Sequence, residues 1–273
     1  MKSGITLTKK DTVVTIISIV FLIMNLAAVQ QRGREHAKKM VCQANLKTIG
    51  QAQFLFLDDN NDRFPIAWKS LVKTDSPASS SGYERFCRWH DERFPVDGPL
   101  FSPYIENYKA VLCPTFVSIA KQVGHNHPQH MSSVPVVPQY SYSMNGLLGG
   151  KQGSAGWNAS SSYGGGAITR NEVTRNPAEV FFFAEEDVLG RSGYSYGLND
   201  NALCGFGLDW FGTFHNTNPN NLNSGSVNAV FVDGHVQEVI SALKEDHNDN
   251  SEMEFGMFEK YCWPHQDKEP STY

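Results

Sequence analysis

The chain opens with a long helical pattern that changes character halfway along. Residues 12–29 read TVVTIISIVFLIMNLAAV, an 18-residue run without a charged side chain. No proline occurs from residue 30 to residue 57, and residues of one face recur every three or four positions, at Cys42, Leu46, Ile49, Ala52 or Gln53, and Phe56. This spacing indicates an amphipathic helix. The pattern predicts one helix of about 45 residues, roughly 70 Å long, that is apolar all round in its first half and on one face in its second.

The predicted helix ends at a polar stop. Residues 58–62 read DDNND, and Phe64-Pro65 follows, a sequence that does not continue a helix. The stop begins like a calcium-binding loop, but Arg63 stands where an EF-hand requires glycine. We therefore interpret it as a polar helix C-terminus.

Short β-like runs follow the helix and alternate with polar loops. Strands are predicted at 111–114, 140–144 and 180–184, and two further runs, 227–232 and 235–240, flank Asp233-Gly234. An Asp-Gly pair between such runs indicates a hairpin with a type I′ turn, in which both central residues take positive φ. The predicted fold class is α+β, with the long N-terminal helix packed on an antiparallel β-sheet that carries large loop insertions. Residues 1–30 form the apolar helix segment, and residues 31–273 form a globular head that includes the second half of the helix.

Composition and motifs narrow the classes of function. The net charge of −5 over 273 residues gives no general nucleic-acid footprint. No nucleophile elbow, HExxH pair or phosphate-binding glycine loop occurs, so an enzyme is not expected. The five cysteines are Cys42, Cys87, Cys113, Cys204 and Cys262. They form no CxxC pair, which disfavours a zinc knuckle, and an exported chain could hold up to two disulfides.

Six stretches spread over most of the chain together resemble type IV prepilins and type II secretion pseudopilins. More narrowly, they resemble the large prepilin-like family of planctomycete-type bacteria with a C-terminal His…Asp-Gly motif. The stretches are 7–20 (LTKKDTVVTIISIV), 32–65, Leu112-Cys113-Pro114, 140–145 (YSYSMN), 176–185 (NPAEVFFFAE), and His215 with 227–235 (VNAVFVDGH).

The resemblance implies a pilin-like fold and a structural function. The chain would be a membrane-inserted subunit able to assemble into a type IV-like filament or secretion pseudopilus through its apolar helix. Its expected partners are copies of itself, the inner membrane and the pilus or secretion assembly machinery, with no nucleic acid. Its expected place is the bacterial inner membrane, with the head in the periplasm, or a cell-surface filament.

The N-terminus departs from the family pattern. The family is cut after a glycine that precedes Phe-Thr-Leu-x-Glu, whereas Gly4 leads into Ile5-Thr6-Leu7-Thr8 here, so efficient cleavage is not expected. In filaments of the family, the glutamate pairs with the next subunit's N-terminal amine. Asp11 lies close to that position and would set the register between helices, or else it is an interfacial residue and helix N-cap. The alternative function is an uncleaved single-pass anchor whose head binds a partner or a polysaccharide.

Three sets of polar residues in the head are candidates for binding or catalysis. The family motif, His215 with Asp233, Gly234 and His235, is expected to be structural, with His215 hydrogen-bonded near the turn. A second alternative function, a membrane-anchored metal-dependent hydrolase, would use His215, Asp233, His235 and Glu185. Glu185-Glu186-Asp187 could hold Ca²⁺ at a strand end, although a solvated strand end is favoured. The histidines at 125, 127 and 130 could bind Zn²⁺ or Cu²⁺, but a histidine-rich loop without metal is the favoured interpretation. No other cofactor is expected.

Overall fold

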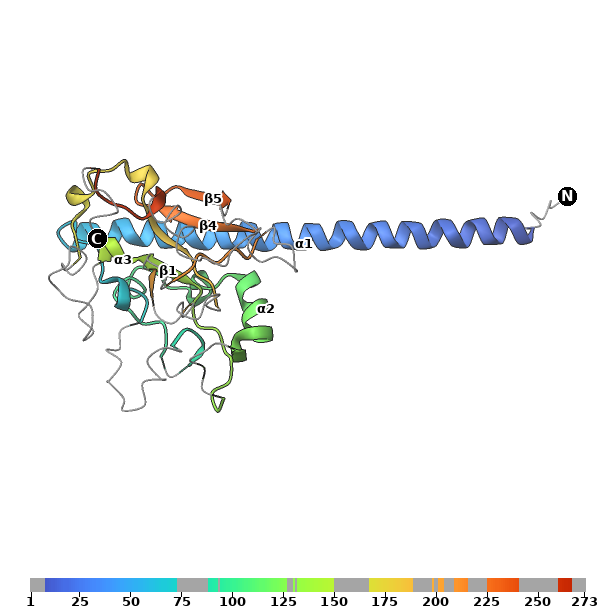
Figure 1. Ribbon diagram of the computed structural model, residues 1–273, viewed down its shortest axis with the longest axis horizontal. Coiled ribbons are helices and arrows are strands. Elements are labelled where there is room, and N and C mark those ends of the chain that lie inside the picture. Colours follow the sequence, from blue (N-terminus) through green and yellow to red (C-terminus); the bar gives the residue numbers. More distant parts are fainter. Residues whose placement is uncertain are drawn as a thin grey trace, which may run out of the picture.

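The protein is a mixed helix-and-sheet molecule in which one long helix projects from a globular head (Figure 1). The computed structural model describes eleven stretches of the 273 residues: 8–72, 88–92, 94–126, 130, 132–149, 167–188, 198, 201–203, 209–215, 225–240 and 260–266. The α+β class is confirmed. Cys87, Cys204 and His127 lie outside the described residues.

Helix α1 (Lys9–Asp59) is longer than predicted, with 51 residues and a length of roughly 77 Å. Thr8 is its N-cap, and Asp11 completes a capping box by accepting a hydrogen bond from the backbone N–H of Thr8 at 2.9 Å. The interpretation of Asp11 itself as the N-cap is therefore wrong, because it occupies the third helical position. At the other end, Asn61 and Asp62 take left-handed φ values of 54° and 58°, which ends the helix at the predicted polar stop.

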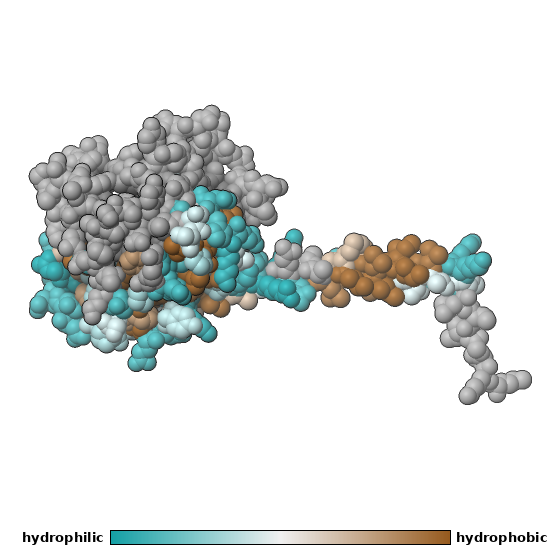
Figure 2. All heavy atoms as spheres, turned by 90° about the horizontal axis from the view of Figure 1, so that it is seen from below, coloured by the Kyte–Doolittle hydropathy of each residue, from teal (hydrophilic) through white to brown (hydrophobic). Residues whose placement is uncertain are grey.

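The two halves of α1 differ in burial as predicted. Cys42, Leu46, Ile49 and Ala52 are fully buried in the head. We call residues 12–29 the apolar stalk. Its described apolar side chains stand clear of the head and form the brown stretch of Figure 2. Within the described ranges, no helix combines the length and the hydropathy that crossing a membrane requires.

The head contains a five-stranded sheet in the order β3-β1-β2-β4-β5. Its strands are β1 (Tyr142–Asn145), β2 (Phe181–Glu185), β3 (Ala202–Leu203), β4 (Ser226–Phe231) and β5 (Val236–Ile240). Four strands pair antiparallel, which confirms the predicted hairpin of β4 and β5. The prediction of a wholly antiparallel sheet is wrong, because β3 pairs parallel with β1 at one edge.

Short helices complete the head. They are α2 (Pro114–Val123), α3 (Gly146–Gly149), and the 3₁₀ turns η1 (Ala67–Lys69), η2 (Arg88–His90), η3 (Tyr108–Val111), η4 (Gly124–Asn126), η5 (Arg170–Glu172) and η6 (Pro177–Glu179). The strand predicted at 111–114 is wrong. Pro114 opens α2 instead, since proline at the first helical position loses no hydrogen bond there, and Cys113 is the N-cap.

Helix α1 packs against β4, β2 and β5 through its buried face. Gly50 allows the close approach, since a Cβ at this position would lie 2.7 Å from Cγ2 of Val230 in β4. At the rim of the contact, Lys39 forms an ion pair with Glu238 of β5 at 2.7 Å. The sheet therefore holds the C-terminal half of α1 by close packing and by peripheral polar contacts.

Candidate functional site

The Asp-Gly turn joins β4 to β5 and faces α1. The backbone N–H of Gly234 donates to the carbonyl of Phe231 at 2.8 Å, so the turn's central residues are Val232 and Asp233. Only Gly234, with φ +83°, takes a left-handed conformation in this turn, so the predicted type I′ turn is wrong and a three-residue loop replaces it. Asp233 accepts a hydrogen bond from the backbone N–H of His235 at 3.0 Å. Lys47 of α1 donates to the Gly234 carbonyl at 2.9 Å, so the turn is also a contact point for the helix.

His215 lies at the opposite end of the hairpin. Its backbone N–H donates to the Ser226 carbonyl at 3.2 Å, and Ser226 opens β4. β4 therefore separates His215 from the turn by five residue steps, roughly 17 Å. The prediction that His215 hydrogen-bonds near the turn is wrong, and so is the hydrolase site that combined His215 and Glu185 with Asp233 and His235.

Instead, His215 belongs to a buried cluster with Cys42, Cys113 and Glu185, which we call the four-residue cluster. Each residue comes from a different part of the fold: α1, the N-cap of α2, the last position of β2, and the residue bridged to the start of β4. One donor atom from each lies within 4.8 Å of the others. All four residues are at most 3% exposed. The described residues contain no other cluster of this kind.

Short contacts order the cluster. His215 Nε2 lies 2.8 Å from Glu185 Oε1 and 3.6 Å from the Cys113 sulfur. The other oxygen of Glu185 accepts hydrogen bonds from the backbone N–H of Asn228, at 2.8 Å, and from its side-chain amide, at 3.3 Å. The Cys113 sulfur accepts from the backbone N–H of Phe116 at 3.5 Å. These contacts hold the carboxylate and one sulfur in place.

The cluster is polar and strongly perturbed although it is buried. Burial alone would lower the pKa of His215, but the Glu185 carboxylate and hydrogen bonds to Cys42 and Glu185 raise it to about 10. A hydrogen bond with Cys113 lowers the pKa of the Cys42 thiol against the opposing effect of burial. Burial raises the pKa of the Cys113 thiol well above its usual range. His215 and Glu185 therefore form a buried ion pair beside two thiols of unequal acidity.

The three consecutive acids after the third predicted strand separate in the structure. Glu185 turns into the four-residue cluster, whereas Glu186 forms a backbone bridge with Phe211 and the backbone N–H of Asp187 donates to the Trp210 carbonyl. The predicted set of three acidic ligands is therefore not assembled. The favoured interpretation as a solvated strand end is also wrong, because all three residues are buried. Ca²⁺ requires six to eight oxygen ligands, and a cluster with two sulfurs and one imidazole does not match that preference.

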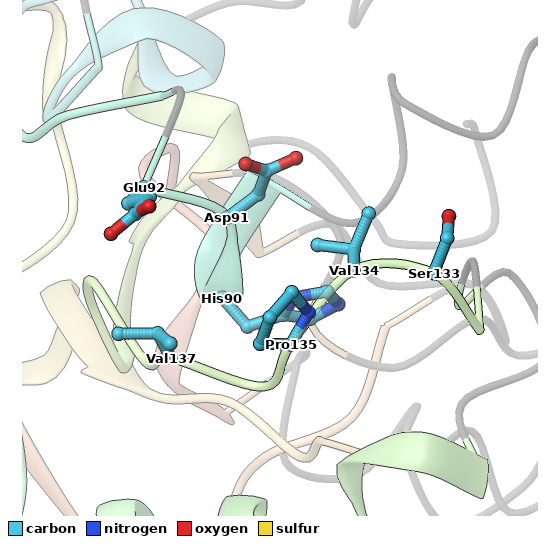
Figure 3. Close-up of a pocket in the computed structure, with 7 residues that line it drawn as sticks. All are labelled: His90, Asp91, Glu92, Ser133, Val134, Pro135 and Val137. Atoms are coloured by element: carbon cyan, nitrogen blue, oxygen red, sulfur yellow. The ribbon is translucent and has the colours of Figure 1, made fainter.

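A separate pocket of about 290 Å³ opens beside η2 (Figure 3). His90 and Asp91 line one side, and the segment 133–137 lines the other. A row of three imidazoles begins at His90: its Nε2 lies 3.1 Å from His130 Nδ1, and His130 Nε2 lies 3.2 Å from His125 Nδ1. Burial, together with the charge of His130, lowers the pKa of His90 to about 4, so His90 is neutral at pH 7. We assign no activity to this pocket.

Thr15 and Asn25, two polar residues of the apolar stalk, bond to their own helix. The hydroxyl of Thr15 donates to the Asp11 carbonyl at 2.7 Å, and the side-chain amide of Asn25 donates to the Phe21 carbonyl at 2.7 Å. These side chains therefore need no external partner for these donors, and they suit apolar surroundings. Twelve large apolar side chains between Val13 and Val29 are 48–68% exposed, so hydrophobic surface dominates the stalk.

Sequence reasoning found only part of the cluster. Glu185 and His215 were candidates, but Cys42 was assigned to a helix face and Cys113 to a strand. The available signal was the motif Leu112-Cys113-Pro114, where proline after cysteine suits a helix start. No protein-family model, curated protein or solved structure matches this chain.

Proposed function

We propose that this chain is a pilin-like structural subunit that assembles with copies of itself through α1. In the resulting filament or pseudopilus, the apolar stalks pack together as a core and the heads form the outer shell. The observation that carries the proposal is the stalk itself, which presents twelve exposed large apolar side chains on a helix that leaves the head. Each such side chain contributes about 1.5–3 kcal/mol when it is fully buried, so a free stalk in water strongly favours association.

Copies of the chain suit this surface better than lipid does, because the exposed apolar positions extend beyond the stalk. Met40, Val41 and Leu55, on the part of α1 that adjoins the head, are 52%, 47% and 55% exposed. From Val13 to Leu55 the helix rises roughly 63 Å, about twice the 30 Å of a bilayer's hydrocarbon core. Helices packed side by side would cover both the stalk and these positions.

The capping box assigns Asp11 a local partner in the free subunit. Its carboxylate accepts hydrogen bonds from the backbone and hydroxyl of Thr8, at 2.9 and 2.7 Å. These bonds lower the pKa of Asp11, so the group is negative at neutral pH. In an assembly, that charge at the start of the stalk would pair with a cation of a neighbouring subunit and fix the axial register between helices.

The test compares two matched substitutions in the full chain. Ile17→Glu places a charge on the stalk, and Ile240→Glu places the same charge on β5 of the head, where Ile240 is 79% exposed. After removal of detergent, wild type and Ile240→Glu should form filaments or discrete oligomers in electron microscopy and sedimentation. Ile17→Glu should stay monomeric.

Two results would overturn the proposal. One is a wild-type chain that remains monomeric when detergent is removed. The other is a chain that enters lipid vesicles as a monomer and never associates, which would establish the anchor function instead. Circular dichroism of each variant distinguishes lost assembly from lost folding, because α1 dominates the helical signal.

A further inference from the structure

The four-residue cluster lies where α1 enters the head. Cys42 is the first fully buried residue of α1, and the helix projects away from the head on its N-terminal side (Figure 1). The other three members belong to the head and are separated from one another by 30 residues or more along the chain. Any bond that joins all four would therefore fasten the helix to the head.

We propose that Cys42, Cys113, Glu185 and His215 bind one Zn²⁺ ion. Two thiolates, one imidazole and one carboxylate are the donor types that zinc takes in tetrahedral sites. All four donors are buried, and no open position remains for a substrate. The site is therefore structural and not catalytic.

All four donor atoms lie within 4.8 Å of one another, and two of their separations fit a tetrahedron with small adjustments. Zinc bonds of about 2.3 Å to sulfur and about 2.0–2.1 Å to nitrogen or oxygen place a sulfur roughly 3.6 Å from a nitrogen and a nitrogen roughly 3.3 Å from an oxygen. The Cys113 sulfur already lies 3.6 Å from His215 Nε2. His215 Nε2 and Glu185 Oε1, now 2.8 Å apart, need to separate by about half an ångström. That change is expected when a metal replaces the proton they share.

Surrounding groups prepare the cluster for an ion. Asn228 donates two hydrogen bonds to Oε2 of Glu185, which leaves Oε1 as the single metal-binding oxygen. Asn228 in turn accepts from the side-chain amide of Gln43, the neighbour of Cys42 on α1, at 3.1 Å. At the N-terminus of α2, the backbone N–H of Phe116 donates to the Cys113 sulfur at 3.5 Å, a contact that a metal-bound sulfur would keep. Such outer contacts orient metal ligands in known sites.

The protons and charges of the cluster balance when the metal binds. The thiol protons of Cys42 and Cys113 and the Nε2 proton of His215 leave to solvent as zinc binds. Two thiolates, one carboxylate and a neutral imidazole around Zn²⁺ carry a net charge of −1, and the Asn228 donors and the α2 N-terminus face that charge. The zinc replaces a buried ion pair and joins α1 to the ends of three head elements.

The experiment uses the full chain, produced with a tag other than histidines and purified without chelators. Elemental analysis should find one zinc per chain. Replacement by Co²⁺ should give the visible d–d absorption of tetrahedral cobalt with thiolate ligands. Removal of the metal should lower the thermal midpoint of the head by about 5 °C or more, and added Zn²⁺ should restore it.

Cys113→Ser is the informative variant, because serine is a good N-cap and keeps the start of α2 intact. It should lose the zinc and the cobalt spectrum, as should His215→Gln. Cys262→Ser, at a buried cysteine outside the cluster, should keep both. The wild-type cobalt spectrum does not depend on whether any variant folds.

Several results would overturn the inference. A wild-type chain without stoichiometric zinc that gives no thiolate–cobalt bands would do so. A disulfide between Cys42 and Cys113, detected as two missing free thiols in the unreduced chain, would do so as well. Equal metal loss in Cys262→Ser would show that the cluster is not the binding site. None of these outcomes depends on whether the chain assembles, so the zinc site and the proposed function stand or fall separately.

Discussion

The close approach of α1 to the sheet at Gly50 allows a quantitative prediction of the stability lost when Gly50 is replaced by alanine. In Gly50→Ala, the new Cβ would lie 2.7 Å from Cγ2 of Val230, whereas carbon atoms in contact prefer 3.5–4.0 Å. Val230 is fully buried in β4, is paired on both sides, and has a stiff side chain, so it cannot yield by rotation. Such overpacking costs about 1–3 kcal/mol, and the rigidity of Val230 places this case in the upper half of the range.

The helix itself would gain from the same substitution. Alanine is better than glycine in a helix interior by about 1 kcal/mol. The net expectation for Gly50→Ala is therefore a loss of about 1–2 kcal/mol in the free energy of unfolding, or a fall of roughly 2–8 °C in the thermal midpoint. The measurement is thermal unfolding of the full chain in nonionic detergent, followed by tryptophan fluorescence, since Trp89 and Trp210 are buried in the head.

Two controls separate packing from propensity. Gly33→Ala has open space around its new methyl group and should leave the head's midpoint unchanged while it raises helicity slightly. The double variant Gly50→Ala/Val230→Ala should lose less stability than the sum of its single variants, because the colliding methyl group is gone. A Gly50→Ala head as stable as wild type, or strict additivity in the double variant, would refute this explanation of the close contact.

Three further expectations concern the turn, the pocket and the helix start. Gly234→Ala combines a left-handed φ of +83° with a Cβ placed 2.5 Å from the Phe54 ring. The same fluorescence assay should therefore show a loss of about 2–3 kcal/mol in the free energy of unfolding. A near-neutral result would contradict this geometry. His90 has a folded-state pKa of about 4 against 6.5 for a free histidine. Its contribution to the free energy of unfolding is therefore complete above pH 6.5 and is lost as pH falls toward 4. In His90→Gln, the free energy of unfolding should fall by about 1–3 kcal/mol less over this pH range than in the wild type. Asp11→Ala removes the hydrogen bonds to Thr8 and should speed amide exchange in the first turn of α1 without changing the head's thermal midpoint.

The parts of the fold that depend on local pattern were predictable from the sequence. The buried face of α1 was predicted residue by residue from Cys42 to Phe56, because helical periodicity depends only on neighbours along the chain. The hairpin of β4 and β5 was predicted for the same reason. The two-residue strand β3 has too short a pattern to be recognised, and its parallel pairing with β1 depends on a tertiary contact.

The four-residue cluster could not be predicted from spacing. Cys42 and Cys113 are 71 positions apart, and His215 follows 102 positions later, so no linear motif joins them. Cys42 also satisfies the helical pattern as an ordinary apolar residue, and that interpretation concealed its second role as a sulfur donor. Cys113 was misassigned because the proline after it was interpreted as the end of a strand and not as the start of α2.

Because α1 is unbroken, the orientation of the head around the helix axis is fixed relative to the stalk. Since one helix runs from Lys9 to Asp59, every residue between stalk and head adds a rotation of about 100° and an advance of about 1.5 Å. One residue inserted at Gly33 would therefore swing the head about a quarter of a turn around the helix axis. Seven inserted residues would restore the orientation to within about 20° while moving the head outward by about 10 Å. The helix thus fixes both the distance of the head from the end of the stalk and the direction in which the head faces around the helix axis.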